Sequence, residues 1–549
     1  MDSHNAWFGR ANKAVSKLLA ELPSDPFGKF SPSVYETGRV VTFAPELAGH
    51  LERVQFLLDR QHEDGSWGGP DEYRLVPALS ATEALLSTLR NTPDSDPVPH
   101  APLVRAAATG LDWLFSQLNG THRVTFPDTV AVEIVVPGLI DEINTHLDRL
   151  DDDPLPGLDP WRGTARLVVP DGAACELLSR LREAVEHGRS LPTKVLHSLE
   201  VLGNSVHGAS FVEPLHGVVG CSPAATAVWL GDRITREVDH PSVRYLVAVQ
   251  ELAGGPVPVA APVTVFERSW VLSTLASAGF AFSPPSELVA ELHDAFGELG
   301  AAGGLGLPPD ADDTSTVLHA LAQLENPRSP NCLWNYEADG HFSCFPNERT
   351  PSTSTNAHAL QAFGSYLISE SAEASRCLEA IGKISPWLCA QQEAEGNWWD
   401  KWHASPYYAT ACCAVSLAEY GVSDAAKAVA KAVDWVLGSQ RADGSWGRWA
   451  GTYEETAYAV QILLRARGPR WHRDIRHATA RGCDFLLRSD PNEEHPALWH
   501  DKDLYTPIRI VRAEGLAALR LAHARPDIAA LVSQVDTADP DPTRRSMAC

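Results

Sequence analysis

The chain has 549 residues, of which 44% are hydrophobic, and it carries 45 Lys and Arg against 70 Asp and Glu. This hydrophobic content excludes general disorder, and a formal charge of −25 without a Lys/Arg-rich block excludes a typical nucleic-acid-binding protein. No apolar run approaches the roughly 18 residues of a membrane-spanning helix. The N-terminal residues lack an apolar signal segment, so we expect a cytoplasmic globular protein of about two to four domains.

Helical periodicity dominates the chain from its first third to its end. Apolar residues recur at i, i+3, i+4 and i+7 in the segments 47–61, 316–324 and 455–467. Alternating strand patterns are nearly absent, and the predicted fold class is all-α. The ten cysteines form no CxxC pair and no zinc-site spacing, so we expect free thiols rather than disulfides or a zinc site.

A short turn recurs between the predicted helices. Residues 61–69 and 440–448 share the pattern Q-x-x-D-G-S-W-G, and looser copies occupy 337–345 and 392–400. The glycine allows a positive φ, and the Gln and the aromatic residue can bind a neighbouring helix. The spacing fits repeated helix pairs, which build either an open solenoid or a closed α/α barrel. Irregular repeats favour closure, and the isolated N-terminal copy favours two barrels.

The segment 306–321, GLPPDADDTSTVLHAL, carries the strongest chemical signal. Two prolines predict a helix start, and Asp310, Asp312 and Asp313 follow directly. Acidic N-capping explains one such residue, but three carboxylates in four positions repel one another. We therefore predict one carboxylic acid that stays protonated at neutral pH and acts as a general acid. Metal binding by the same cluster is the alternative.

These motifs resemble those of the class II terpene cyclases, and in particular the copalyl diphosphate synthases. DADD is similar to the DxDD motif of that family, and the repeated turns are similar to its QW motifs. Six further segments resemble the family in the same order along the chain, namely 128–143, 196–203, 222–230, 265–272, 397–408 and 498–507.

The resemblance implies two α/α barrels with the active site between them. It predicts a β domain of residues 1–38 and 277–549 and an inserted γ domain of residues 39–276. The implied reaction is protonation of geranylgeranyl diphosphate and its cyclisation to a copalyl diphosphate of ent type, with the diphosphate retained. No DDxxD motif occurs, so diphosphate ionisation is not expected, and a separate class I terpene synthase would consume the product.

By the same resemblance Asp312 is the general acid, which Asp310 and Asp313 orient and polarise. Asn356 and His358 are candidates to hydrogen-bond the acid from the next helix. Positions i and i+2 of a helix point about 200° apart, so only one of these two side chains is expected to face Asp312.

The diphosphate requires cations, and Lys401, Lys502 and Arg448 lie in matching C-terminal segments. Mg²⁺ is the expected cofactor. Asp128 and Glu133 form a D-x4-E pattern whose members can share one ion if Asp128 precedes the helix. Solvated surface charge is the alternative for each of these residues.

Carbocations require an aromatic-lined cavity, for which Trp334 and Trp398 are the candidates. His197 matches the histidine that holds the deprotonating water in plant ent-type enzymes. Val259 stands where the asparagine partner is expected, so half of that dyad is missing. The alternatives are a drimane-type cyclase of farnesyl diphosphate and a non-catalytic α/α-barrel binding module.

Overall fold

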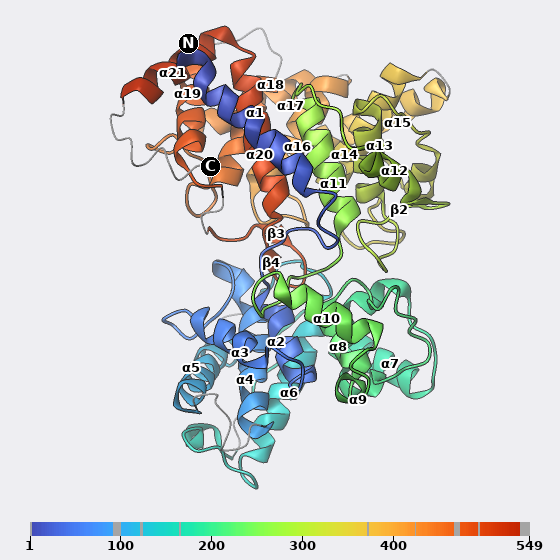
Figure 1. Cartoon of the computed structure of the whole chain (residues 1–549), viewed down its shortest axis with the longest axis vertical. Coiled ribbons are helices and arrows are strands. Elements are labelled where there is room, and N and C mark those ends of the chain that lie inside the picture. Colours follow the sequence, from blue (N-terminus) through green and yellow to red (C-terminus); the bar gives the residue numbers. More distant parts are fainter. Residues whose placement is uncertain are drawn as a thin grey trace.

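The computed structural model describes residues 3–91, 100–120, 125–163, 166–370, 373–422, 424–465, 473–491 and 495–538. Its helices form two lobes, an upper one with α1 and α11 to α21 and a lower one with α2 to α10 (Figure 1). The predicted all-α class is confirmed, because each lobe is a ring of inner helices with further helices packed outside it. No helix in the described ranges has the length and apolarity needed to cross a membrane.

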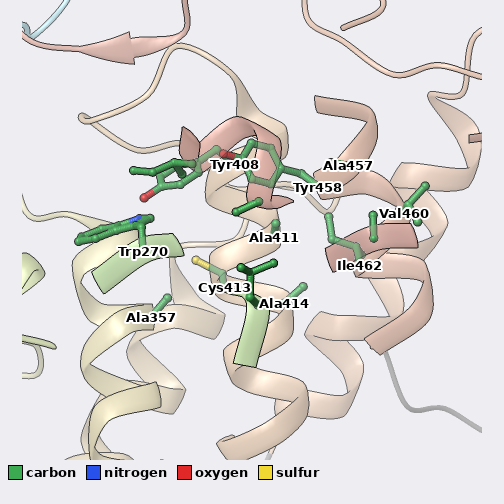
Figure 2. Packing of buried hydrophobic residues seen from close by; sticks show 14 of the residues in the cluster. Trp270, Ala357, Tyr408, Ala411, Cys413, Ala414, Ala457, Tyr458, Val460 and Ile462 are labelled. Carbon is green, nitrogen blue, oxygen red and sulfur yellow. The ribbon is translucent and has the colours of Figure 1, made fainter. Parts of the chain in front are cut away.

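The upper barrel is closed, because each inner helix contacts the next and the last contacts the first. Small side chains such as Ala357, Ala411 and Ala457 allow these helices to approach closely (Figure 2). The inner ring consists of α11 (Thr264–Ser277), α13 (Ala311–Gln323), α14 (Thr353–Ser369), α16 (Pro406–Tyr420), α18 (Tyr453–Arg465) and α20 (Ile508–His523). The outer helices are α1 (Ser3–Glu21), α12 (Ser286–Asp294), α15 (Ala374–Ala390), α17 (Ala425–Gly438), α19 (Arg473–Arg488) and α21 (Pro526–Ala538).

The lower barrel closes in the same way around a separate apolar core. Its inner ring consists of α2 (Val34–Phe43), α4 (Leu75–Asn91), α6 (Val132–Arg149), η3 (Thr193–Val206) and α8 (Pro223–Leu230). The remaining elements of this lobe are α3 (His50–Asp59), η1 (Asp71–Arg74), α5 (His100–Leu118), η2 (Asp159–Trp161), α7 (Cys175–Glu186), α9 (Arg233–Arg236) and α10 (Pro241–Glu251).

Short strands lie in some of the connections between the helices. Strands β1 (Phe296–Gly297) and β2 (Gly300–Ala301) pair antiparallel just before the DADD segment, and η4 (Asn331–Tyr336) follows α13. Strands β3 (Trp499–His500) and β4 (Leu504–Tyr505) form a hairpin at the junction of the two lobes (Figure 1). The chain at Phe30 bridges to Pro507 near this hairpin, so the junction contains segments from both ends of the sequence.

The predicted domain boundaries are displaced. The prediction placed residues 1–38 in the barrel that carries DADD, yet α2 packs into the lower barrel through Tyr35. It placed residues 39–276 in the inserted barrel, yet Phe266 and Trp270 of α11 belong to the upper core. The crossings therefore lie between residues 22 and 34 and between 261 and 266. Periodicity alone does not reveal which ring a helix joins.

The repeated turns have the predicted construction. In the turn that begins at Gln440, the side-chain amide donates to the carbonyls of Gly444 and Ala478, and Trp446 Nε1 donates to the Val436 carbonyl at 2.7 Å. The turns at 61–67 and 392–398 make the equivalent bonds. The turn glycines adopt positive φ, as at Gly444 (+93°). Each turn therefore ties one helix pair to the next.

Candidate active site

The DADD segment begins the inner helix α13. Asp310 is the N-cap residue, with extended φ and ψ, and it accepts a 2.8 Å hydrogen bond from the Asp313 backbone N–H. Asp312 and Asp313 lie in the first turn, where the helix dipole favours negative charge. The capping role thus accounts for Asp310 alone and leaves two further carboxyl groups at the same helix end.

Burial changes the proton affinity of this cluster. Burial first, and then the charge of Asp312, raises the pKa of Asp310 to about 7. Burial first, and then the charge of Asp310, raises the pKa of Asp313 well above its ordinary value. A Cβ at Gly303 would come within 2.4 Å of Asp313 Oδ2, so a glycine backbone closes this side of the carboxyl. The pair of Asp310 and Asp313 therefore holds a proton at neutral pH.

One of the two predicted helix partners faces the acid. His358 Nδ1 lies 2.7 Å from Asp312 Oδ1. Asn356 is fully buried and instead bonds the backbone of Phe342 and the carbonyl of Ser352. His358 is thus the direct partner of Asp312, whereas Asn356 holds the chain segment that precedes α14.

Aromatic rings form a continuous layer beside this pair. The Trp270 ring lies 5.3 Å from the His358 ring, and the Tyr408 ring lies 4.8 Å from the Trp499 ring. Figure 2 shows Trp270, Tyr408 and Tyr458 gathered at one end of the inner helices. Ring faces attract cations, so this layer suits a carbocation. Its members are Phe266, Trp270, Tyr408, Tyr458, Trp499 and Tyr505.

The two tryptophans predicted to line the cavity lie elsewhere. Trp398 is fully buried in a repeated turn, where its Nε1 donates to the Leu388 carbonyl. Trp334 stacks on Phe363 at 4.9 Å and lies 4.0 Å beneath the Arg376 guanidinium. The prediction was wrong because both rings serve structural packing outside the aromatic layer.

A cavity lined by both aromatic and polar side chains lies inside the upper barrel, next to His358. Glu514 lies in its wall and accepts hydrogen bonds from Thr274 (2.8 Å) and Gln461 (2.5 Å), and burial raises the pKa of this carboxyl. Burial lowers the pKa of His319 to about 3, so this second histidine of the wall stays neutral. The cavity thus brings proton-carrying groups to the side of the barrel that His358 faces.

Lys502 is enclosed at the junction of the two barrels. Its side chain has 0% exposure, and its ammonium group pairs with Glu36 and with Glu200 (2.9 Å). It also donates to the His197 carbonyl at 2.7 Å and to Ser222 Oγ at 3.1 Å. These partners occupy every N–H of the ammonium group, which contradicts the predicted diphosphate role for Lys502.

His197 is held by the same hairpin. Its Nε2 lies 3.0 Å from Asp501 Oδ1, and its Nδ1 lies 2.7 Å from the Gly220 carbonyl oxygen. Burial acts to raise the pKa of Asp501, but the nearby charges of His197 and Lys502 outweigh it and lower the pKa, so Asp501 is ionised. The carboxylate and the Gly220 carbonyl are then both acceptors. Both ring nitrogens must then donate, and the charge of Asp501 outweighs burial and raises the pKa of His197.

Asp501 and the Gly220 carbonyl engage both ring N–H groups of His197, so neither is left to hold a deprotonating water, which contradicts that predicted role. Val259 is buried against Cys221 and Ala260, so the missing half of the dyad is replaced by an apolar contact.

The other two predicted diphosphate cations lie nearer the surface. Lys401 Nζ lies 2.5 Å from Glu348 Oε2 and donates to the Thr350 carbonyl at 2.8 Å. Arg448 donates to the Ala404 carbonyl and lies 3.2 Å from Glu72 of the lower barrel. Both cations are partly exposed at the junction, so a ligand can exchange with their present partners.

The predicted magnesium ligands meet the condition set by their spacing. Asp128 lies in the loop before α6, and Glu133 lies in the first turn of that helix. Both carboxylates act on the same guanidinium, that of Arg349, through a 2.7 Å hydrogen bond from Arg349 to Asp128 and the nearby charge of Glu133. No cluster of three or more potential metal ligands occurs among the described residues. Two carboxylates beside the same cation fit Mg²⁺, which commonly completes its shell with water and substrate phosphate.

Comparison with known proteins shows which family the chain belongs to. It is 43% identical over 524 residues to the ent-copalyl diphosphate synthase of Streptomyces sp. (strain KO-3988), covering 94% of this chain and 98% of that protein. The chain belongs to the copalyl diphosphate synthase family of class II terpene cyclases. Residues 349–503 also match the squalene-hopene cyclase C-terminal domain family.

Two further relatives of this cyclase show the same extent of similarity. The labda-7,13-dienyl diphosphate synthase of Streptomyces clavuligerus is 40% identical over 524 residues, with 93% of each chain covered. The structure of ent-copalyl diphosphate synthase from Streptomyces platensis superposes with a TM-score of 0.88 at 45% identity, covering 93% of this chain and 99% of that one. The resemblance recognised from the motifs is thereby confirmed.

Sequence reasoning missed several residues of this cyclase site. Trp270 lies in the segment 265–272 that resembled the family, and Tyr408 lies in 397–408, so both were within recognised segments but were not singled out. Asp501 likewise lies in the recognised segment 498–507. Arg349 gave no signal, because an isolated charge in a loop has no periodicity or spacing to mark it.

Proposed function

We propose that the protein cyclises geranylgeranyl diphosphate to ent-copalyl diphosphate by protonating its terminal alkene. The observation that carries this proposal is the 2.7 Å contact between His358 and Asp312, beside two carboxyl groups of raised pKa and an aromatic layer. A relative that is 43% identical and is named ent-copalyl diphosphate synthase supports the substrate and the stereochemistry.

Asp312 is the proposed acid. We assign the His358 Nδ1–H as a donor to Asp312 Oδ1, which fixes the carboxyl and leaves Oδ2 to deliver the proton. The same hydrogen bond stabilises the carboxylate that remains after transfer. One proton is added to the alkene and one is lost from the final cation, so substrate and product are isomers and the diphosphate stays intact.

The aromatic layer is proposed to shield the cations formed between these two proton transfers. Trp270, Tyr408 and Tyr458 each present a ring near the acid, and each ring face is worth about 0.5–2 kcal/mol to a cation. Water is excluded where these rings pack together, which prevents premature capture of the cation.

Lys401 and Arg448 are proposed to bind the diphosphate by exchanging their present carboxylate partners for phosphate oxygens. Asp128 and Glu133 would hold Mg²⁺, which neutralises diphosphate charge when it is bound. A separate enzyme that ionises allylic or copalyl-type diphosphates would consume the product, since this chain has no DDxxD motif.

The final deprotonation cannot use His197, whose two nitrogens both donate. A relative at 40% identity is named for a labda-7,13-dienyl product, which shows that the double-bond position varies within this similarity range. Which proton is lost last determines the double-bond position of the product, and product analysis tests it directly.

The test is incubation of the purified protein with geranylgeranyl diphosphate and Mg²⁺, followed by phosphatase treatment and chiral gas chromatography. We expect ent-copalol only after phosphatase, and no pyrophosphate release. Asp312→Asn should reduce turnover to background because it removes the transferable proton, whereas the exposed Asp239→Asn should match the wild type. Wild-type turnover by a folded Asp312→Asn protein, or a preference for farnesyl diphosphate, would contradict the proposal.

A further inference from the structure

Arg349 joins the two barrels at the predicted magnesium site. It lies in the loop between η4 and α14 of the upper barrel, and its Nη2 lies 2.7 Å from Oδ1 of Asp128 in the lower barrel. The Arg349 side chain is 67% exposed and that of Asp128 is 38% exposed. The pair is therefore open to solvent and can separate without exposing apolar surface.

The Arg349 guanidinium occupies the position beside Asp128 that a bound metal ion would need. It is hydrogen-bonded to Asp128, and Glu133 adds a second negative charge nearby. A cation bound by both carboxylates would repel Arg349 and would take the carboxylate oxygen to which it now donates. Arg349 and a metal ion therefore compete for Asp128.

The loop that carries Arg349 is also linked to the DADD segment and to a second cation. Glu348 accepts from the Cys344 backbone N–H at 2.9 Å, and the Cys344 carbonyl accepts from Ala311 N–H of the DADD segment at 3.0 Å. Lys401 binds both Glu348 and the Thr350 carbonyl. Arg349 is thus held close to a residue that we propose binds diphosphate.

We infer that Arg349 is an exchangeable cation, which neutralises Asp128 in the free protein and moves to the substrate diphosphate when Mg²⁺ takes its place. The inference rests on the proposed function, because it requires a diphosphate ligand. A guanidinium can donate two parallel hydrogen bonds to phosphate oxygens, so its transfer exchanges one charged partner for another.

Binding measurements test this exchange without relying on turnover. Arg349→Gln should bind Mn²⁺ alone about two- to fivefold more tightly than the wild type, because the competing exposed ion pair is lost. The same variant should bind inorganic pyrophosphate in the presence of Mg²⁺ about tenfold more weakly, because one charge-assisted contact is lost. Calorimetry or the electron paramagnetic resonance of Mn²⁺ gives both affinities.

Arg236→Gln is the matched control, since Arg236 forms an exposed pair with Asp232 (3.1 Å) in the same barrel as Asp128. It should leave both affinities at wild-type values. In an Asp128→Asn background, Arg349→Gln should no longer tighten Mn²⁺ binding. Unchanged Mn²⁺ affinity or unchanged pyrophosphate affinity in Arg349→Gln would each overturn the inference. Failure of the wild type to cyclise geranylgeranyl diphosphate would refute the proposed function separately.

Discussion

Replacing Lys502 by Met separates a structural role for this lysine from the ligand role that its sequence position suggested. Lys502, Glu36 and Glu200 all have side chains with 0% exposure. Methionine keeps most of the side-chain length but leaves two buried carboxylates without their cation. Breaking a buried ion pair in this way costs about 3–5 kcal/mol of unfolding free energy.

The loss should depend on pH. Burial raises the pKa of Glu36 to about 7, and the charge of Lys502 opposes that rise. Without the lysine the folded-state pKa rises further, so the stability of the variant is retained at low pH and is lost as pH increases through that pKa. Lys502→Met should therefore lose more stability at pH 8 than at pH 6.

Urea unfolding followed by tryptophan fluorescence at both pH values measures these differences. The exposed Lys427→Met, which breaks a surface pair with Asp424, is the matched control and should change little. Adding Glu200→Gln to Lys502→Met should recover part of the loss, because it removes one uncompensated charge. Wild-type stability of Lys502→Met combined with a raised KM for geranylgeranyl diphosphate would refute the structural role.

Two further predictions concern the acid and the metal. Wild-type turnover should fall as pH rises through the raised pKa of Asp310, about 7, and then through that of Asp313. Asp310→Asn should move this limb to lower pH, because it removes the charge that raises the pKa of Asp313, and an unmoved limb in the kcat profile would count against the coupling. Glu133→Ala should raise the KM for substrate and the Mg²⁺ requirement more than it lowers kcat. An unchanged Mg²⁺ titration would mean that Glu133 only stabilises the first turn of α6 and does not bind the metal.

Local patterns in the sequence determined the helices, the repeated turns and the cluster of carboxyl groups. The glycine, glutamine and tryptophan of the turns act within about ten residues or on the adjacent helix pair, so spacing alone predicted their bonds. The DADD segment likewise combines a cap and a charge cluster within four residues. Such features depend on neighbours in the chain, so the helices and the turns were predicted correctly, whereas the general-acid role of Asp312 stays a prediction.

Tertiary structure decided which of the remaining candidates can reach a ligand. Lys401 and Lys502 look alike in sequence, yet only the fold brings Glu36 and Glu200, hundreds of residues away, around Lys502. Trp398 and Trp270 are the same residue type, but their tertiary contacts differ. Trp398 packs in a repeated turn, whereas Trp270 lies beside His358. Burial and charge pairing are sums over the whole folded chain, so no local pattern could have separated these residues.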